Sequence, residues 1–178
     1  MGIEALTQVM SSPSAPAESS VDWPQVEEKI GTPLPDDYKE FIQKYGTGVI
    51  DSFFWIFNPV SKNKNLSLIE RIKISEDELN TLRAQLPDRF TYAPYPNAGG
   101  LMPAGTTDNG DMIYWKTGKQ PNQWSIVIGS TRDGEFEEFE TGLTDFLVSL
   151  ISRRFSSRIL PSTFPSVNAK FDPFPRSA

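Results

Sequence analysis

The chain contains no cysteine and no histidine among its 178 residues. Without cysteine there is neither a disulfide nor a thiolate, so the sequence leaves the redox compartment open. Because histidine and cysteine are both absent, the chain cannot form a Ser-His-Asp or Cys-His catalytic site. For the same reason it cannot form the usual zinc site. Paired carboxylates remain as a device for acid–base catalysis, and no spacing places a pair at one cleft. The sequence therefore predicts no catalytic, metal-binding or cofactor-binding residues.

Long apolar runs and an excess of positive charge are also missing. No apolar stretch approaches the roughly 18 to 20 residues that a membrane helix needs, and the first residues carry no basic segment. We therefore expect neither a membrane span nor a signal peptide. Seventeen basic residues stand against 23 acidic ones, which gives a net charge of −6. This charge disfavours nucleic acid as a direct ligand and favours a basic protein partner.

The two ends of the chain are less regular than its middle. A length of 178 residues suits one domain over residues 1–178. Apolar residues at helical spacing predict a short N-terminal helix within residues 3–10, and residues 11–20, rich in Ser, Pro and Ala, predict a flexible linker. Residues 155–178 are rich in Ser and Pro and predict an irregular C-terminal strap.

Two short helices with clear start and stop residues are predicted after the linker. Asp22 is a suitable N-cap for the first, and Gly31 is placed to end it in the left-handed conformation. Pro35 fits the first turn of the second helix, and Gly46 ends it. Apolar residues at spacings of three and four form one stripe on each helix: Trp23, Val26 and Ile30, then Tyr38, Phe41, Ile42 and Tyr45. Both helices should therefore pack on a flat surface.

A strand and a long helix are predicted next. Residues 49–57 hold seven apolar residues in nine and predict one strand in the centre of its sheet. The phase of the leucines favours a single helix over residues 67–86, with Ser67 as its cap. A second possible cap at Ser75 would allow a break near Lys73.

The last third of the chain predicts a meander and a helix. Prolines and glycines make residues 87–103 an extended loop, and strands are expected at residues 112–115, 124–128 and 135–139. A helix should follow Thr141. The predicted fold class is α+β, with a single antiparallel or mixed sheet of about five to six strands covered by helices.

The order of these aromatic, glycine and proline residues resembles the SUKH superfamily, which includes the Smi/Knr-type bacterial immunity proteins. The pattern runs from a Trp through Ile-Gly, Leu-Pro, Asp-Tyr and Tyr-Gly-x-Gly to Gly-x-Thr-Asp-Asn-Gly-Asp and a second Trp. The motif residues, which are largely scaffold residues in the family, are Trp23, Gly31, Pro35, Tyr38, Tyr45, Gly46, Gly48, Gly105, Asp108, Gly110 and Trp115. The resemblance implies a SUKH-like domain that acts as a binder and not as a catalyst.

The resemblance also implies a partner. Many SUKH proteins neutralise toxins, often nucleases, released by competing bacteria, while fungal relatives regulate cell-wall synthesis. We therefore expect a cytoplasmic immunity protein that binds a cognate polymorphic toxin, with a basic toxin domain as the partner. Two alternatives stay open: a regulatory or scaffold module of the same fold, and a carboxylate-based hydrolase. The sequence determines neither the toxin nor the oligomeric state.

Two acidic segments are candidate sites. Residues 107–111 offer oxygen ligands for calcium but lack the distal glutamate of a calcium loop, and Asn109-Gly110 instead predicts a tight turn. The densest acidic stretch is formed by Asp133, Glu135, Glu137, Glu138 and Glu140. It is either a hairpin edge protected against aggregation or a face for basic side chains of the toxin. Together with Trp55 as an aromatic anchor, it is the predicted partner-binding site.

Overall fold

The computed structural model describes residues 2–130 and 132–174 and has an α+β fold, as predicted. The helices are α1 (Gly2–Val9), α2 (Trp23–Ile30), α3 (Asp36–Tyr45), α4 (Leu68–Gln85) and α5 (Leu143–Ile151), with a short 3-10 helix, η1 (Pro121–Gln123). The strands are β1 (Gly48–Ile50), β2 (Phe54–Ile56), β3 (Leu101–Thr107), β4 (Met112–Lys116), β5 (Ser125–Gly129), β6 (Phe136–Phe139) and β7 (Phe171–Pro173). In the described chain these strands form one antiparallel sheet in the order β6-β5-β4-β3-β2-β1-β7, which is larger than expected.

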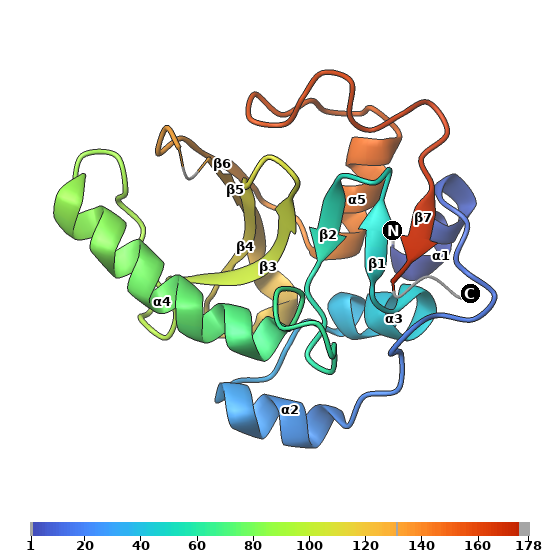
Figure 1. The fold of residues 1–178 in the computed structure, drawn as a ribbon, viewed down its shortest axis with the longest axis horizontal. Coiled ribbons are helices and arrows are strands. Elements are labelled where there is room, and N and C mark those ends of the chain that lie inside the picture. Colours follow the sequence, from blue (N-terminus) through green and yellow to red (C-terminus); the bar gives the residue numbers. More distant parts are fainter. Residues whose placement is uncertain (1, 131, 175–178) are drawn as a thin grey trace.

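Helices α1, α3, α4 and α5 divide between the two faces of this sheet (Figure 1). α1, α3 and α5 pack together on the face that we call the inner face. There Phe54 of β2 stacks on Phe146 of α5, and Trp115 of β4 contacts Tyr38 of α3 edge to face, with ring centroids 4.8 Å apart. α4 lies across β3 on the opposite, outer face. The core therefore sits on the inner face, and α4 covers only part of the outer one.

Residues 49–57 form a hairpin, and the prediction of one central strand is wrong. β1 and β2 pair antiparallel around Asp51 and Ser52, whose φ angles of 50° and 54° lie in the left-handed region. Asp is among the residues that tolerate this conformation. The Asp51 carboxylate also accepts hydrogen bonds from the backbone N–H groups of Ser166 and Lys170, at 2.8 and 2.9 Å. These contacts with the C-terminal strap hold the turn, and the hairpin lies toward one edge of the sheet.

Two strands that the sequence did not predict, β3 and β7, enlarge the sheet. β3 begins inside the segment expected to be an extended loop, and its pairing with β4 shifts register between Pro103 and Gly105. A strand tolerates proline at such an irregularity because a ladder hydrogen bond is already missing there. Six of the seven residues of β3 are buried, so the strand shows no apolar–polar alternation. β7 comes from the strap and pairs with β1 at the sheet edge.

The predicted caps of α2 and α4 are confirmed, whereas the predicted position of Pro35 is not. Asp22 accepts a backbone hydrogen bond in the first turn of α2, at 3.2 Å, and Gly31 ends that helix with a left-handed φ of 88°. Pro35 immediately precedes α3 instead of lying in its first turn. Ser67 caps α4, which continues past Lys73 as one helix.

Several motif residues hold α3 against its surroundings. The buried Tyr38 hydroxyl donates to the carbonyl of Phe57 at 2.7 Å, and the Tyr45 hydroxyl donates to the carbonyl of Met10 at 2.6 Å. Gly46 has a φ of 70°, and a Cβ there would lie 2.0 Å from a backbone oxygen of the preceding linker. A side chain at this position would therefore collide with the backbone.

Both terminal segments contact the body of the domain. The carbonyl of Ala17 accepts a hydrogen bond from the N–H of Thr47 at 2.8 Å, and the Glu18 carboxylate accepts one from the Thr47 hydroxyl at 2.7 Å. In the strap, Phe164 stacks on Phe54 with ring centroids 5.7 Å apart. The flexibility of residues 11–20 stays a prediction, and residues 175–178 of the predicted strap lie outside the described residues.

Candidate functional site

One row of the outer face runs across the sheet from edge to edge. Residues directly opposite one another in antiparallel strands point to the same side. From β7 to β6 the row consists of Asp172, Val49, Trp55, Thr106, Met112, Gly129 and Phe136. Phe136 packs against Phe90 and Tyr92, so the β6 end is covered. No helix of the described residues lies over the β7 end (Figure 1). We call the part from Asp172 to α4 the open face.

Trp55 is the aromatic centre of the open face. Its side chain is half-buried, its indole N–H donates to Asp108 Oδ1 at 2.8 Å, and its ring contacts Phe174 edge to face with centroids 5.9 Å apart. A hollow of about 250 Å³ beside it is lined by Val49 and Asp172. The motif residue Asp108 therefore orients the tryptophan that the sequence singled out as an anchor.

A cleft of about 700 Å³ continues the open face beneath α4. Its lining includes Phe57, Leu79, Leu82, Thr106, Met112 and Tyr114. Thr106 is also the cross-strand neighbour of Trp55, so the cleft and the tryptophan are adjacent. Asp77 and Glu78 lie at the α4 side of the cleft with exposed side chains. The cleft thus combines an apolar floor with an acidic rim.

One guanidinium and two carboxylates set the charge of this cleft. Arg71 Nη2 lies 3.4 Å from Glu78 Oε2, and the guanidinium lies 5.8 Å from the ring centroid of Phe57. Burial raises the pKa of Tyr114, and the nearby charge of Glu78 raises it further, so the phenol is neutral at pH 7. With Asp77, the carboxylates outnumber the Arg71 cation that lines the cleft.

Glu137, from the predicted acidic site, anchors the strap. Its carboxylate accepts hydrogen bonds from the Ser157 hydroxyl, from the Arg158 N–H at 2.9 Å and from the Arg158 guanidinium at 3.1 Å. Burial by itself would raise the pKa of Glu137, but these hydrogen bonds outweigh it and hold the pKa below its usual value. The side chain is only 10% exposed. Its charge is therefore largely compensated inside the molecule.

Glu138 points to the opposite face of the sheet, because side chains alternate along a strand. It accepts hydrogen bonds from the Lys116 ammonium at 2.8 Å and the Ser125 hydroxyl at 2.7 Å. Asp133 accepts one from Ser130, at 3.3 Å. The two remaining acidic residues of the stretch, Glu135 and Glu140, are exposed. The five predicted residues therefore do not share one surface, and none of them lines the cleft.

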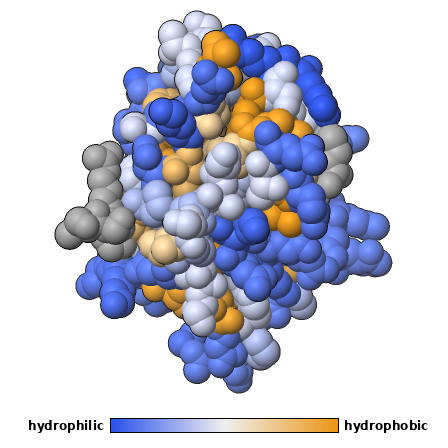
Figure 2. Space-filling model, turned by 90° about the vertical axis from the view of Figure 1, so that its right-hand side faces the viewer, coloured by the Kyte–Doolittle hydropathy of each residue, from blue (hydrophilic) through white to orange (hydrophobic). Residues whose placement is uncertain are grey.

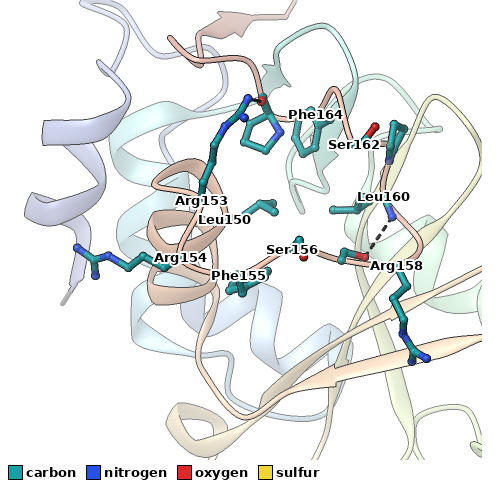
Figure 3. Close-up of a pocket in the computed structure, with 12 residues that line it drawn as sticks. Leu150, Arg153, Arg154, Phe155, Ser156, Arg158, Leu160, Ser162 and Phe164 are labelled. Carbon is teal, nitrogen blue, oxygen red and sulfur yellow. Dashed lines mark hydrogen bonds between the residues drawn. The ribbon is translucent and has the colours of Figure 1, made fainter.

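A second cavity, of about 740 Å³, lies between the end of α5 and the strap (Figure 3). Three arginines border it, but their guanidinium groups do not converge. Arg153 donates to the carbonyl of Pro165 at 3.0 Å, Arg154 points away from the cavity, and Arg158 reaches Glu137. This arrangement offers no common anion-binding geometry.

The turn at residues 107–111 is closed by its own hydrogen bonds. Gly110 has a φ of 85°, as the predicted turn requires, and the Thr107 hydroxyl donates to Asp111 Oδ2 at 3.1 Å. Across residues 2–130 and 132–174, no group of three or more acidic, His or Cys side chains is arranged to hold a metal ion. Over the same residues, no helix is long and apolar enough to cross a membrane.

The side of the molecule that carries α1 and β7 adds no second candidate. Apolar side chains form small patches there, separated by hydrophilic ones (Figure 2). Scattered apolar residues of this kind are normal on protein surfaces.

The sequence analysis named Trp55 as a candidate residue but did not predict the cleft. The cleft forms only when α4 crosses strands that lie far from it in the sequence. The only local feature was the run of three acidic residues 76–78 in α4, which is equally typical of a solvated helix face. Nothing local indicated that they border Phe57, which follows β2, and the β4 residues Met112 and Tyr114.

Comparisons with known proteins agree with the fold. The SUKH_6 family model, described as SMI1-KNR4 cell-wall, matches residues 21–147. The SPbeta prophage-derived uncharacterized protein YokK of Bacillus subtilis (strain 168) is 27% identical over 142 residues, which cover 68% of this chain and 72% of the relative. No solved structure gives a significant match. The matched residues include Trp55, Asp108 and the whole cleft, while α1 and β7 lie outside them.

Proposed function

The chain belongs to the SUKH_6 family of SMI1-KNR4 proteins, and we propose that it is a non-enzymatic, immunity-type protein that neutralises a cognate toxin in the cytoplasm. The observation that carries this proposal is the open face, where Trp55 lies beside an apolar cleft with an acidic rim. A central aromatic residue next to a desolvated pocket, surrounded by charge, is typical of protein–protein interfaces. The net charge of −6 favours a basic partner.

We propose that the open face, and not the acidic stretch as a whole, makes the main contact. The carboxylates of Glu137 and Glu138 already pair with Arg158 and Lys116 of the same chain, so little of their negative charge is left for a partner. Asp133, Glu135 and Glu140 stay proposed rim residues, which would steer the toxin and act mainly on the association rate. A nuclease is one class of toxin that fits, because proteins that bind nucleic acid carry basic surfaces.

Affinity capture followed by a growth assay tests this function. The tagged chain is purified from its native cells, bound proteins are identified by mass spectrometry, and the gene for each captured protein is expressed alone in a second host. We expect one captured basic protein to arrest growth. Co-expression of this chain should restore growth once the molar amount of the chain reaches that of the toxin, because inhibition by binding is stoichiometric.

The variant Trp55→Ala tests the face. Loss of a central aromatic anchor costs about 2 kcal/mol or more, which weakens binding roughly 30-fold, so protection should fail. Tyr92→Ala, an aromatic truncation at the covered end of the outer face, is the matched control and should still protect. Full protection by a folded Trp55→Ala protein would contradict the proposed face.

Two outcomes would favour the alternative functions. A captured partner without toxicity would favour the regulatory or scaffold module. Substrate turnover that one carboxylate substitution abolishes would favour a hydrolase.

A further inference from the structure

We infer that the cleft beneath α4 receives an arginine side chain of the toxin, an inference that rests on the proposed function. Arginine joins an aliphatic stem to a planar cation, so its pocket needs apolar walls, an aromatic ring and a carboxylate within reach. The cleft supplies all three.

The sheet side of the cleft offers the apolar and aromatic surface. Phe57, Met112 and Tyr114 line it and are themselves buried, so their positions are fixed by the core. Leu79 and Leu82 of α4 face them across the cleft. An aliphatic stem between these two walls would lose water on both sides, and a guanidinium can stack on an aromatic ring.

The helix side offers the carboxylates. The Glu78 side chain is 50% exposed, and its contact with Arg71 uses a single oxygen at 3.4 Å. Its second oxygen accepts no hydrogen bond from any described residue. Asp77 is exposed beside it. A second guanidinium can therefore pair with this rim without displacing Arg71.

Arg71 shows the geometry that the cleft accepts. Its guanidinium lies near the Phe57 ring and against Glu78, so the chain already holds one arginine by the same two contacts. A lysine would pair with the carboxylates, but it has no planar group to stack on a ring and no two parallel N–H groups to match one carboxylate. An acidic side chain would be repelled by Asp77 and Glu78, while the cation that could attract it already lies against Glu78.

A titration with a single amino-acid probe tests the inference on the full chain. N-acetyl-arginine amide is added to the ¹⁵N-labelled protein, and N-acetyl-citrulline amide, which has the same shape without the charge, is the comparison ligand. We expect saturable shifts of the Glu78 and Met112 amide signals with the arginine probe and much weaker ones with citrulline. Glu78→Gln should weaken binding about threefold or more, since a charged hydrogen bond is lost.

Two further variants make the outcome unambiguous. Glu76→Gln removes a neighbouring exposed charge that does not line the cleft and should leave the titration unchanged. Thr81→Trp fills the cleft from an exposed position on α4 and should abolish binding. Equal shifts with citrulline, or an unchanged titration in a folded Thr81→Trp protein, would overturn the inference. If Glu78→Gln and Thr81→Trp still neutralise the toxin with unchanged affinity, the inference fails while the proposed function stands.

Discussion

Gly105 lies where β3 passes closest to β2. A Cβ at this residue would lie 2.2 Å from the carbonyl oxygen of Trp55, far inside van der Waals contact. The glycine is therefore required by the close approach of two backbones and not by a left-handed φ. Because Trp55 belongs to the proposed interface, this family-motif glycine also positions the functional face.

Gly105→Ala should lower the free energy of unfolding by about 2 kcal/mol, because the methyl group forces the two strands apart. Gly118→Ala is the matched control, since the nearest atom to its Cβ would be 3.9 Å away. Urea unfolding followed by tryptophan fluorescence measures both. Equal midpoints for the two variants would show that β2 and β3 can separate without cost.

The strap depends on two carboxylates that bind its backbone. Asp51, in the β1–β2 turn, accepts hydrogen bonds from the N–H groups of Ser166 and Lys170, and Glu137 of β6 accepts one from that of Arg158. Between these points Phe164 packs on the hairpin. The strap, which has little regular structure, is thus held near both ends by the carboxylates of Glu137 and Asp51. The stability of the strap should therefore depend on the negative charge of these two groups.

Glu137→Gln should lower the free energy of unfolding by about 2 kcal/mol at pH 7, because hydrogen bonds to a charged group are lost. The pKa of Glu137 is lower in the folded protein than in the unfolded chain, so its contribution is present above the unfolded pKa and lost as the pH falls through the folded pKa. The difference between wild type and variant should therefore shrink in acid.

Denaturant midpoints of both proteins at neutral and acidic pH measure this effect. Glu135→Gln, an exposed glutamate two residues away, is the control and should behave as wild type at both pH values. A wild-type advantage that persists below the folded pKa would mean that the carboxylate charge is not what holds the strap.

The molecule as a whole is larger than the part that matches its family. Residues 21–147 carry the motif, yet α1 fills the inner face and β7 covers the edge of β1. Leu6 and Met10 are almost fully buried, and the carbonyl of Met10 accepts the hydrogen bond of the motif residue Tyr45. The N-terminal segment is therefore part of the core and not an appendage.

Deletion of residues 1–20 should lower the free energy of unfolding by about 4 kcal/mol or more, since two buried apolar side chains and their packing are lost. Leu6→Ala in the full chain should reproduce about half of this loss, whereas Gln8→Ala, at an exposed position of α1, should change little. Thermal and urea unfolding measure all three. An unchanged midpoint for the deletion would mean that the matched region folds independently of α1.

The sequence by itself determined the parts of this protein whose signals are local. The caps of α2 and α4, the stop at Gly31, the turn at Gly110 and the strands of the meander could be predicted because each depends on neighbouring residues. The ordered motif added the family and the fold class, and two of its residues, Tyr38 and Trp115, contact each other where α3 meets the sheet. The sequence also named Trp55 as an interface anchor, and that role stays a prediction.

Only the tertiary structure decided what depends on contacts between distant segments. The Asp51 turn and the strand β7 exist because the strap returns to the β1 edge, which no window of sequence contains. Glu137 and Glu138 read as one acidic patch, but strand alternation places them on opposite faces, each with its own partners. The cleft forms where α4 crosses β3 and β4, because side-chain packing between elements, and not the composition of any one of them, creates a concave surface.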